Sequence, residues 1–445
     1  MVNRFKPQAE SGDQLAEEKP TRQRFWVMGM LFVSVVINYL DRSNLSIVAP
    51  RLSDEMHLSP HLLGATLSAF GWTYALFQIP ASRLVDRINP RALFATTLAL
   101  WSVGTLLMGF TGTILQILAL RLAVGAFEAP SYPINNRIAT TWFGETERAS
   151  VIGFYTSGQF VGLAFLTPVL TWIESRFGWR FVFQATGAAG LLWALAWWVW
   201  YRDPLQSRWI NRAELRHISD GGGIPDLSRR LNQTGGSTFW KDLRVVMGNR
   251  QLIGVYIGQF GLSSTLWFFL TWFPTYLVRF RHIALVNAGL MAAFPFLAAF
   301  VGVLSGGILS DWLLRKGHNL TVARKLPIIT GLLLASTLCL ANLTDRSSVA
   351  LSLMACSFFG CGFASISWSV ISTMAPERLI GLTGGVFNFI SNCAAIVVPI
   401  AIGFLIRGTS FSLPLIFISM MALMGIGSYV FLVGDIRRVE DRSGE

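Results

Sequence analysis

Two charged residues interrupt the first long apolar stretch of this sequence. Asp41 and Arg42 follow an apolar run over residues 25–37, and a short apolar segment, residues 46–49, comes soon after them. A charge at the centre of a bilayer costs about 2.5–3.5 kcal/mol on the insertion scale. A membrane protein that accepts this cost usually uses the charges, so we expect both residues to serve its function. The alternative is a static pair at the membrane edge, stabilised by interfacial water.

A second acid and base lie in another apolar stretch, where Arg121 and Glu128 are seven positions apart. This spacing places them on one face of a helix, two turns apart. Gly125 between them would allow a neighbouring helix to come close. Glu128 lies deep in the stretch, beside Pro130 and Pro133. Arg121 could instead lie near a helix end and extend to the interface as a simple anchor.

These four groups could together carry protons. We expect the carboxylates of Asp41 and Glu128 and the guanidinium groups of Arg42 and Arg121 to face a common cavity. An acid that gains and loses an arginine partner can take up a proton on one side of a membrane and release it on the other. Asp41 and Glu128 are therefore the predicted proton-coupling residues, with Arg42 and Arg121 as their charge partners.

Neutral polar residues in other apolar stretches suggest what else the cavity holds. One cation surrounded by amides and hydroxyls suits a polyhydroxylated anion, because the arginine takes the carboxylate and the neutral groups bind the alcohols. Helix–helix hydrogen bonding is the alternative role for such residues. The candidates are Tyr39, Tyr74, Gln159, Gln259, Ser365, Ser367, Trp368 and Asn388, together with Arg42.

The composition is that of an all-α integral membrane protein. Of the 445 residues, 53% are hydrophobic and 13% are charged, whereas soluble domains carry roughly 25% charged residues. The apolar runs are about 20 residues long, enough to cross a bilayer. We predict twelve transmembrane helices, at residues 25–48, 62–82, 92–111, 113–136, 149–172, 179–200, 251–277, 286–309, 326–343, 348–371, 379–405 and 412–433.

The connections divide these helices into two sets of six. The one long connection, residues 201–250, separates a predicted N-terminal bundle, 25–200, from a C-terminal bundle, 251–433. Lys and Arg are concentrated in alternate loops, which include this linker and the tails 1–24 and 434–445. By the positive-inside rule, the linker and both tails are predicted to be cytoplasmic.

Similar loop motifs recur in the two sets. Asp86 and Asp311 follow the second and eighth stretches, and Glu147-Arg148 and Glu377-Arg378 precede the fifth and eleventh. The near-constant spacing indicates a duplicated six-helix unit, which would place a binding site between the halves. The predicted conformational latches at these loops, with solvated loop charge as the alternative, are Asp86, Arg87, Arg91 and Asp311.

The linker and the remaining motifs exclude other classes of function. Residues 204–218 could form a surface helix, and the glycines at 221–223 are expected to be a flexible linker because no P-loop residues follow them. The four cysteines lack metal-ligand spacing. We find no nucleophile–base pair, so we expect no enzyme, no metal and no cofactor. The dispersed basic residues argue against nucleic acid, and one chain with both repeats is expected to be a monomer.

Several segments resemble the anion:cation symporter branch of the major facilitator superfamily. They are residues 38–45, the stretch from Arg121 to Glu128, the Asp86-Arg87 loop, and residues 154–160, 264–274 and 379–389. Ser82 and Asn89 stand where this superfamily usually has glycine. This difference bears on how tightly the loop between them can turn, and not on the fold.

The resemblance implies proton-coupled uptake of a sugar acid by alternating access in a bacterial inner membrane, driven by the proton gradient. D-galactonate is the first expected substrate; a hexuronate, glucarate or other organic anion, or a sugar-acid sensor without transport, are alternatives. In this branch the acids matching Asp41 and Glu128 are protonation sites, the arginine matching Arg42 faces the substrate carboxylate, and the one matching Arg121 pairs with the acids. The neutral residues named above would line the sugar-acid pocket.

Overall fold

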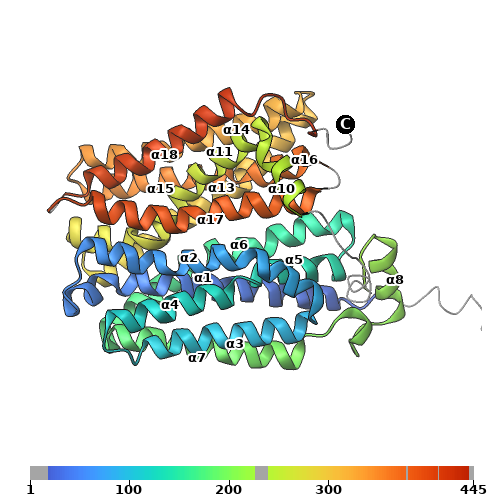
Figure 1. Ribbon diagram of the computed structural model, residues 1–445, viewed down its shortest axis with the longest axis horizontal. Helices are drawn as coiled ribbons and strands as arrows, with labels where there is room; N and C mark the ends of the chain where they lie inside the picture. Colours follow the sequence, from blue (N-terminus) through green and yellow to red (C-terminus); the bar gives the residue numbers. More distant parts are fainter. Residues whose placement is uncertain (1–18, 226–238, 377–378, 409, 440–445) are drawn as a thin grey trace, which may run out of the picture.

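The structure, a computed structural model, describes residues 19–225, 239–376, 379–408 and 410–439. Within these ranges the chain is helical, apart from turns and one isolated bridge between Arg407 and Ser410. Figure 1 shows two groups of long helices side by side, one formed by α1 to α7 and the other by α11 to α18. The predicted all-helical fold class is confirmed.

The first group contains seven helical segments. They are α1 (Gln23–Glu55), α2 (Pro60–Arg87), α3 (Pro90–Met108), α4 (Ile114–Glu128), α5 (Ser131–Trp142), α6 (Glu145–Phe177) and α7 (Trp179–Trp200). The linker that follows contains η1 (Pro204–Gln206) and α8 (Arg212–Asp220). Helices α4 and α5 together form one membrane span, interrupted at Ala129 and Pro130.

The second group begins with a short helix, α10 (Phe239–Gly248), that leads into α11 (Arg250–Thr271). The remaining elements are α12 (Phe273–Thr275), η3 (Tyr276–Phe280), α13 (Leu285–Arg315), α14 (Leu320–Ser336), η4 (Thr337–Leu343), α15 (Ser347–Phe363), η5 (Ala364–Ile366), α16 (Ser367–Met374), α17 (Ile380–Leu405) and α18 (Ser412–Phe431). Two spans are therefore composite, one of α14 with η4 and one of α15 with η5 and α16.

Eleven helical segments among the described residues are long and apolar enough to cross a membrane. The twelfth predicted span is α2, which has 28 residues and is therefore about 42 Å long at 1.5 Å per residue. It runs beside α17, which is one of the eleven, through the depth of the bundle (Figure 1). The chain is thus a multi-pass membrane protein with the predicted number of helices.

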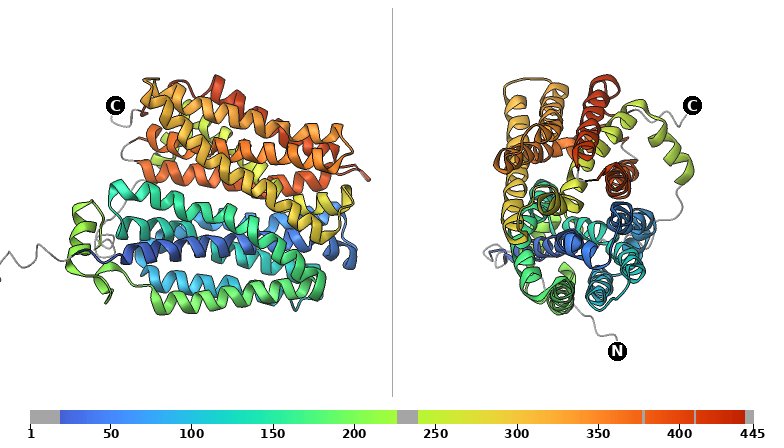
Figure 2. Two further views of the ribbon diagram at one scale, coloured as in Figure 1. Left: turned by 180° about the vertical axis from the view of Figure 1, so that it is seen from behind. Right: turned by 90° about the vertical axis from the view of Figure 1, so that its left-hand side faces the viewer.

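Both described chain ends lie at one end of the bundle, which we call the tail end. Helix α1 begins there, and Val439 donates its N–H to the carbonyl of Met374 at the end of α16. Figures 1 and 2 place α8 and α10 at the same end. Parts of the predicted tails and linker, residues 1–18, 226–238 and 440–445, lie outside the described residues, as do Glu377 and Arg378.

The described residues of the linker after α7, residues 201–225, differ from the expectation in two places. A helix was expected over residues 204–218, but η1 covers only Pro204–Gln206 and α8 begins at Arg212, capped by the side chain of Asn211. The glycines after α8 pack against the turn before α6, where Glu145 donates its N–H to the carbonyl of Gly221 at 2.8 Å. This part of the glycine run is therefore held in place by backbone contacts.

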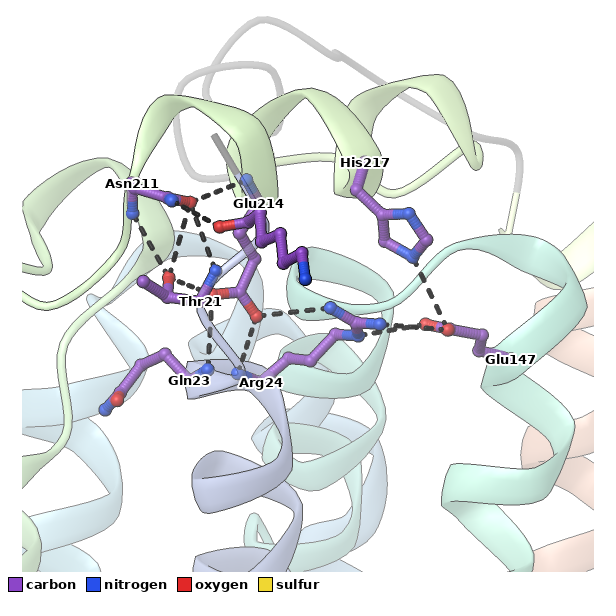
Figure 3. A network of polar contacts seen from close by, with 8 residues as sticks. Thr21, Gln23, Arg24, Glu147, Asn211, Glu214 and His217 are labelled. Atoms are coloured by element: carbon purple, nitrogen blue, oxygen red, sulfur yellow. Dashed lines mark hydrogen bonds and ion pairs between the residues drawn. The ribbon is translucent and has the colours of Figure 1, made fainter. Parts of the chain in front are cut away.

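The linker helix also caps the first membrane helix. Glu214 of α8 is fully buried and accepts hydrogen bonds from the hydroxyl of Thr21 and the backbone N–H groups of Gln23 and Arg24 (Figure 3). Its carboxylate also lies 3.3 Å from the Arg24 guanidinium. The first N–H groups of a helix lack partners within it and attract a negative charge. Glu214 supplies that charge, so α8 is fastened to the start of α1.

The two halves contact each other mainly through α2 with α17 and α6 with α13. Small residues let these helices approach closely: a Cβ added at Gly64 would lie 2.5 Å from the carbonyl oxygen of Pro399, and one at Gly71 would lie 2.8 Å from Cβ of Ala395. Small residues serve this purpose in membrane helices generally. The candidate site lies beside this contact.

Candidate functional site

A buried ion pair joins the first and fourth spans. Nε of Arg42 lies 2.6 Å from Oε1 of Glu128, and the exposed fractions of the two side chains are 4% and 0%. Helix α4 ends at Glu128 because Pro130 follows it, and proline cannot continue the backbone hydrogen bonds of a helix. The predicted pairing of an intramembrane acid with an intramembrane base is therefore present, and it connects residues 86 positions apart in the sequence.

Asp41 and Arg121 lie in the same region, but they do not form the same kind of pair. The carboxylate oxygen Oδ2 of Asp41 accepts a hydrogen bond from Nε1 of Trp101 at 3.1 Å. Arg121 donates to the backbone carbonyl of Asp41 at 3.2 Å. Asp41, Arg121 and Trp101 are all buried. The structure thus brings together all four predicted charged residues. The arginine paired with Glu128 is Arg42 and not Arg121.

Aromatic rings surround the Arg42 guanidinium. Its Cζ lies 4.6 Å from the ring centroid of Tyr74, 4.9 Å from that of Tyr39 and 5.2 Å from that of Phe70. Cation–π contacts of this kind become stronger when water is excluded. Tyr39 and Tyr74, both predicted to bind substrate, therefore help to hold the arginine in place.

Several polar atoms of this cluster remain unpaired. Among the described residues, Nη2 of Arg42 and Oδ1 of Asp41 are buried without a hydrogen-bond partner. Leaving a buried polar group unpaired costs about 1–3 kcal/mol, and more when the group is charged. A ligand oxygen that accepted from Nη2 would remove this cost at Arg42. The cluster can therefore bind an anion through Nη2 of Arg42 while Glu128 remains bonded to Nε.

The close packing of α4 on α2 fixes the cluster in position. A Cβ added at Gly125 would lie 2.3 Å from the carbonyl oxygen of Phe70 and 2.4 Å from Oγ1 of Thr73. That hydroxyl donates to the carbonyl of Leu122 at 2.6 Å, which ties the two helices together. The predicted role of Gly125 in close helix approach is confirmed.

Amides and hydroxyls from the second half form a separate network. Gln259 donates from Nε2 to the hydroxyls of Ser263 at 3.3 Å and Ser391 at 3.2 Å. Its Oε1 accepts from the hydroxyl of Ser367 at 2.8 Å. Ser367 is the first residue of α16, directly after the short helix η5. Gln259 and Ser367, predicted to bind substrate, are thus hydrogen-bonded to other helices of their own half.

One hydrogen bond connects this region to the first half. Asn388 of α17 donates from Nδ2 to Oε1 of Gln78 on α2, at 2.7 Å. In the same region, the rings of Phe70 and Trp267 have centroids 6.3 Å apart. Asn388, a predicted binding residue of the second half, therefore contacts the first half across the α2–α17 contact, through a residue that was not predicted.

The remaining three predicted binding residues lie away from the charged cluster's contacts. Gln159 and Ser365 are half-buried. Trp368 is 49% exposed, with its ring edge against Phe387 at a centroid distance of 4.7 Å. Among the described residues, no hydrogen bond or ion pair joins these three side chains to the charged cluster.

The predicted latch residues contact their own halves. Arg91 donates to the carbonyl of Trp198 at 2.8 Å, and Asp311 lies 3.8 Å from Arg324. Arg87 is exposed, and the side chain of Asp86 lies outside the described part of the structure. Among the described residues, an ion pair between the halves occurs at the end opposite the tail end, where Arg279 contacts Asp54.

Comparison with known proteins gives a family for this arrangement. The profile of the Major Facilitator Superfamily matches residues 31–399. The chain belongs to this superfamily. It is 47% identical over 425 residues to a D-galactonate transporter of Escherichia coli O6:H1, covering 95% of this chain and 98% of that one. It is 39% identical over 428 residues to a probable galactarate/D-glucarate transporter of Bacillus subtilis strain 168, covering 95% and 94%.

Solved structures support the same fold. An inward open conformation of a xylose transporter from Escherichia coli aligns with a TM-score of 0.72, at 13% identity, covering 94% of this chain and 98% of that one. The resemblance found in the sequence is confirmed. As a member of the major facilitator superfamily whose relatives are named transporters, this protein is a membrane transporter of small molecules and not an enzyme.

Several residues of the candidate site were not predicted from the sequence. They are Phe70, Gln78, Trp101, Ser263 and Ser391. Gln78 and Phe70 lie one turn on either side of Tyr74, and Ser263 lies one turn from Gln259. Helical spacing from a predicted binding residue was therefore the available signal for these three. Ser391 lies one turn from Asn388, so the same signal applied to it, whereas nothing in the local sequence indicates Trp101.

Proposed function

We propose that this transporter is a proton-coupled importer of a sugar acid, with D-galactonate as its first substrate. The observation that carries the proposal is the buried Arg42, held at 2.6 Å by Glu128 and with Nη2 unpaired among the described residues. A guanidinium has donors enough to bind two carboxylates. The name of the 47% identical relative supports the same substrate.

The proposed coupling follows from the sharing of Arg42. While Glu128 is ionised, it competes with a substrate carboxylate for the guanidinium. Protonation of Glu128 removes its charge, so Arg42 turns more fully to the substrate. Loss of the proton after the bundle has opened to the other side restores the Arg42–Glu128 pair and releases the anion. Asp41, held by Trp101, is the proposed second protonation site, with Arg121 beside its backbone.

The proposal also covers the orientation of the protein in the membrane, its energy source and its oligomeric state. The tail end would face the cytoplasm of a bacterial inner membrane, since Lys and Arg concentrate in the loops of that end. The proton gradient would supply the energy without a cofactor. One chain contains both halves and would work as a monomer. Alternating access would require separation of Arg279 from Asp54 at the opposite end.

Uptake into proteoliposomes with an imposed pH gradient tests this function. Labelled D-galactonate should accumulate when the outside is acidic, and a protonophore should abolish the accumulation. Preference for D-galacturonate or D-glucarate would favour the second candidate function, and the name of the 39% identical relative supports D-glucarate. Binding of the anion without accumulation would instead identify a sensor.

Glu128→Gln tests the coupling step in the same vesicles. The amide resembles a permanently protonated acid, so we expect the variant to bind D-galactonate and exchange it across the membrane but not to concentrate it. Glu145→Gln, which makes the same change at an exposed position of α6, should transport normally. Concentrative uptake by Glu128→Gln at the wild-type level would remove Glu128 from proton coupling.

A further inference from the structure

An additional amide lies on the face of α2 that contacts Arg42. Phe70, Tyr74 and Gln78 follow at intervals of four residues, so they lie on one face of the helix at successive turns. The first two carry the rings beside the Arg42 guanidinium. Gln78 lies one turn further along and is 8% exposed. Its carboxamide reaches α17, so it lies between the halves.

A chain of amides fixes the orientation of the Gln78 side chain. Asn392 donates from Nδ2 to Oδ1 of Asn388 at 3.2 Å and to the carbonyl of Asn388 at 2.8 Å. Because Oδ1 of Asn388 accepts this bond, Nδ2 of Asn388 is the donor toward Gln78. Oε1 of Gln78 is therefore the acceptor. Its Nε2 is buried and has no hydrogen-bond partner within the described residues.

Two unpaired donors thus occur on neighbouring parts of one site. Nη2 of Arg42 is charged, whereas Nε2 of Gln78 is neutral. A buried donor without an acceptor is destabilising, so both gain from an oxygen-rich ligand. Tyr74 contacts Arg42 and lies one turn from Gln78, and residues four apart on a helix have Cβ atoms about 5–6 Å apart. A polyol chain with a carboxylate at one end carries acceptors for both donors, the carboxylate for Arg42 and a hydroxyl for Gln78.

We propose that Gln78 is a specificity-determining residue that donates from Nε2 to a hydroxyl of the sugar acid whose carboxylate Arg42 holds. The inference rests on the proposed function and adds to it. A neutral amide in place of a second cation satisfies a hydroxyl but does not neutralise a carboxylate. The site therefore favours an acid with one carboxylate over a diacid with one at each end.

Two substitutions separate this role from a structural tie between α2 and α17. Gln78→Glu keeps the length of the side chain and an acceptor for Asn388 but removes the donor, and Gln78→Met removes both without adding charge. Gln184→Glu, a half-buried amide of α7 that contacts the carbonyl of Gly109, is the matched control. Binding to the purified full chain is measured by calorimetry for D-galactonate and its single-deoxy analogues.

Both Gln78 variants should bind D-galactonate about tenfold more weakly, the equivalent of one hydrogen bond. Wild type and Gln78→Met should have equal affinity for the one deoxy analogue that lacks the hydroxyl bound by Gln78. Wild-type affinity in both variants, or an equal loss for every analogue, would overturn the inference while leaving the proposed function intact. If Gln78→Met does not fold, Gln78→Glu decides. A wild-type protein that binds no sugar acid at all would overturn both.

Discussion

The contact between Glu214 and the start of α1 allows a prediction about stability that does not depend on the substrate. Glu214→Ala removes the acceptor of four donors: the hydroxyl of Thr21, the N–H groups of Gln23 and Arg24, and the Arg24 guanidinium. Loss of a helix cap costs about 0.5–2 kcal/mol. Removing one partner of a buried ion pair costs about 3–5 kcal/mol.

The sum of the cap cost and the ion-pair cost would overestimate the loss of stability. Arg24 keeps a second partner in Glu147, at 3.4 Å, and its side chain is 10% exposed, so part of the charge remains compensated. We therefore expect the opening of the α8–α1 contact to become easier by about 2–4 kcal/mol, or roughly 30- to 700-fold at 1.4 kcal/mol per factor of ten. Glu214→Gln keeps an acceptor oxygen but no charge, so its effect should be smaller.

Hydrogen exchange with mass spectrometry measures this opening directly. Peptides containing residues 19–24 and 211–224 should exchange faster by the stated factor, while peptides from the centre of α3 or α15 should not change. Glu145→Ala, at an exposed site on the neighbouring turn, is the control and should leave both peptides protected. If Glu214→Ala exchanges at residues 21–24 within threefold of wild type, the capping role is refuted.

Three further predictions concern the charged cluster. Arg42→Lys should weaken D-galactonate binding at least tenfold, because a single ammonium cannot bind Glu128 and a substrate carboxylate in the same fork geometry; unchanged affinity in calorimetry would contradict this. Trp101→Phe removes the donor to Asp41 and should change the pH dependence of uptake while leaving the melting temperature within a few degrees; an unchanged pH profile would separate Asp41 from coupling. Gly125→Ala should destabilise the purified protein by about 1–3 kcal/mol, the usual cost of overpacking, since the new Cβ would meet the carbonyl of Phe70.

The Gly125→Ala prediction has a matched control elsewhere in the same protein. Gly153 of α6 has no heavy atom within 4 Å of an added Cβ, so Gly153→Ala tests the same substitution without the clash. Alanine is favoured over glycine in a helix by roughly 0.5–1 kcal/mol. Gly153→Ala should therefore melt at or above the wild-type temperature, and equal melting of the two variants would show that helix contact at Gly125 is not limiting.

Hydropathy was sufficient to predict the membrane helices. A helix that crosses about 30 Å of hydrocarbon must satisfy its backbone internally and present apolar side chains along about 20 residues. These requirements act within one segment, so they are visible in sequence. The apolar pattern of α2 is weaker, since this helix carries the polar residues Thr73, Tyr74 and Gln78 among its apolar ones. The breaks at Pro130 and after Phe363 were not predicted.

The sequence by itself identified Asp41, Arg42, Arg121 and Glu128 as charges within apolar stretches, but it left a membrane-edge position for Asp41 and Arg42, and an interface position for Arg121, as alternatives to burial. Only the tertiary structure decided how they pair. Whether Arg42 reaches Glu128, and Arg121 the backbone of Asp41, depends on the rotation and height of α1 against α4, and helix contacts such as that of Gly125 with Phe70 hold α4 in place. Helical periodicity identifies a face, but the neighbour of that face is chosen by packing between segments far apart in the chain. The same reason explains why the link between Gln78 and Asn388, 310 positions apart, became visible only in the folded molecule.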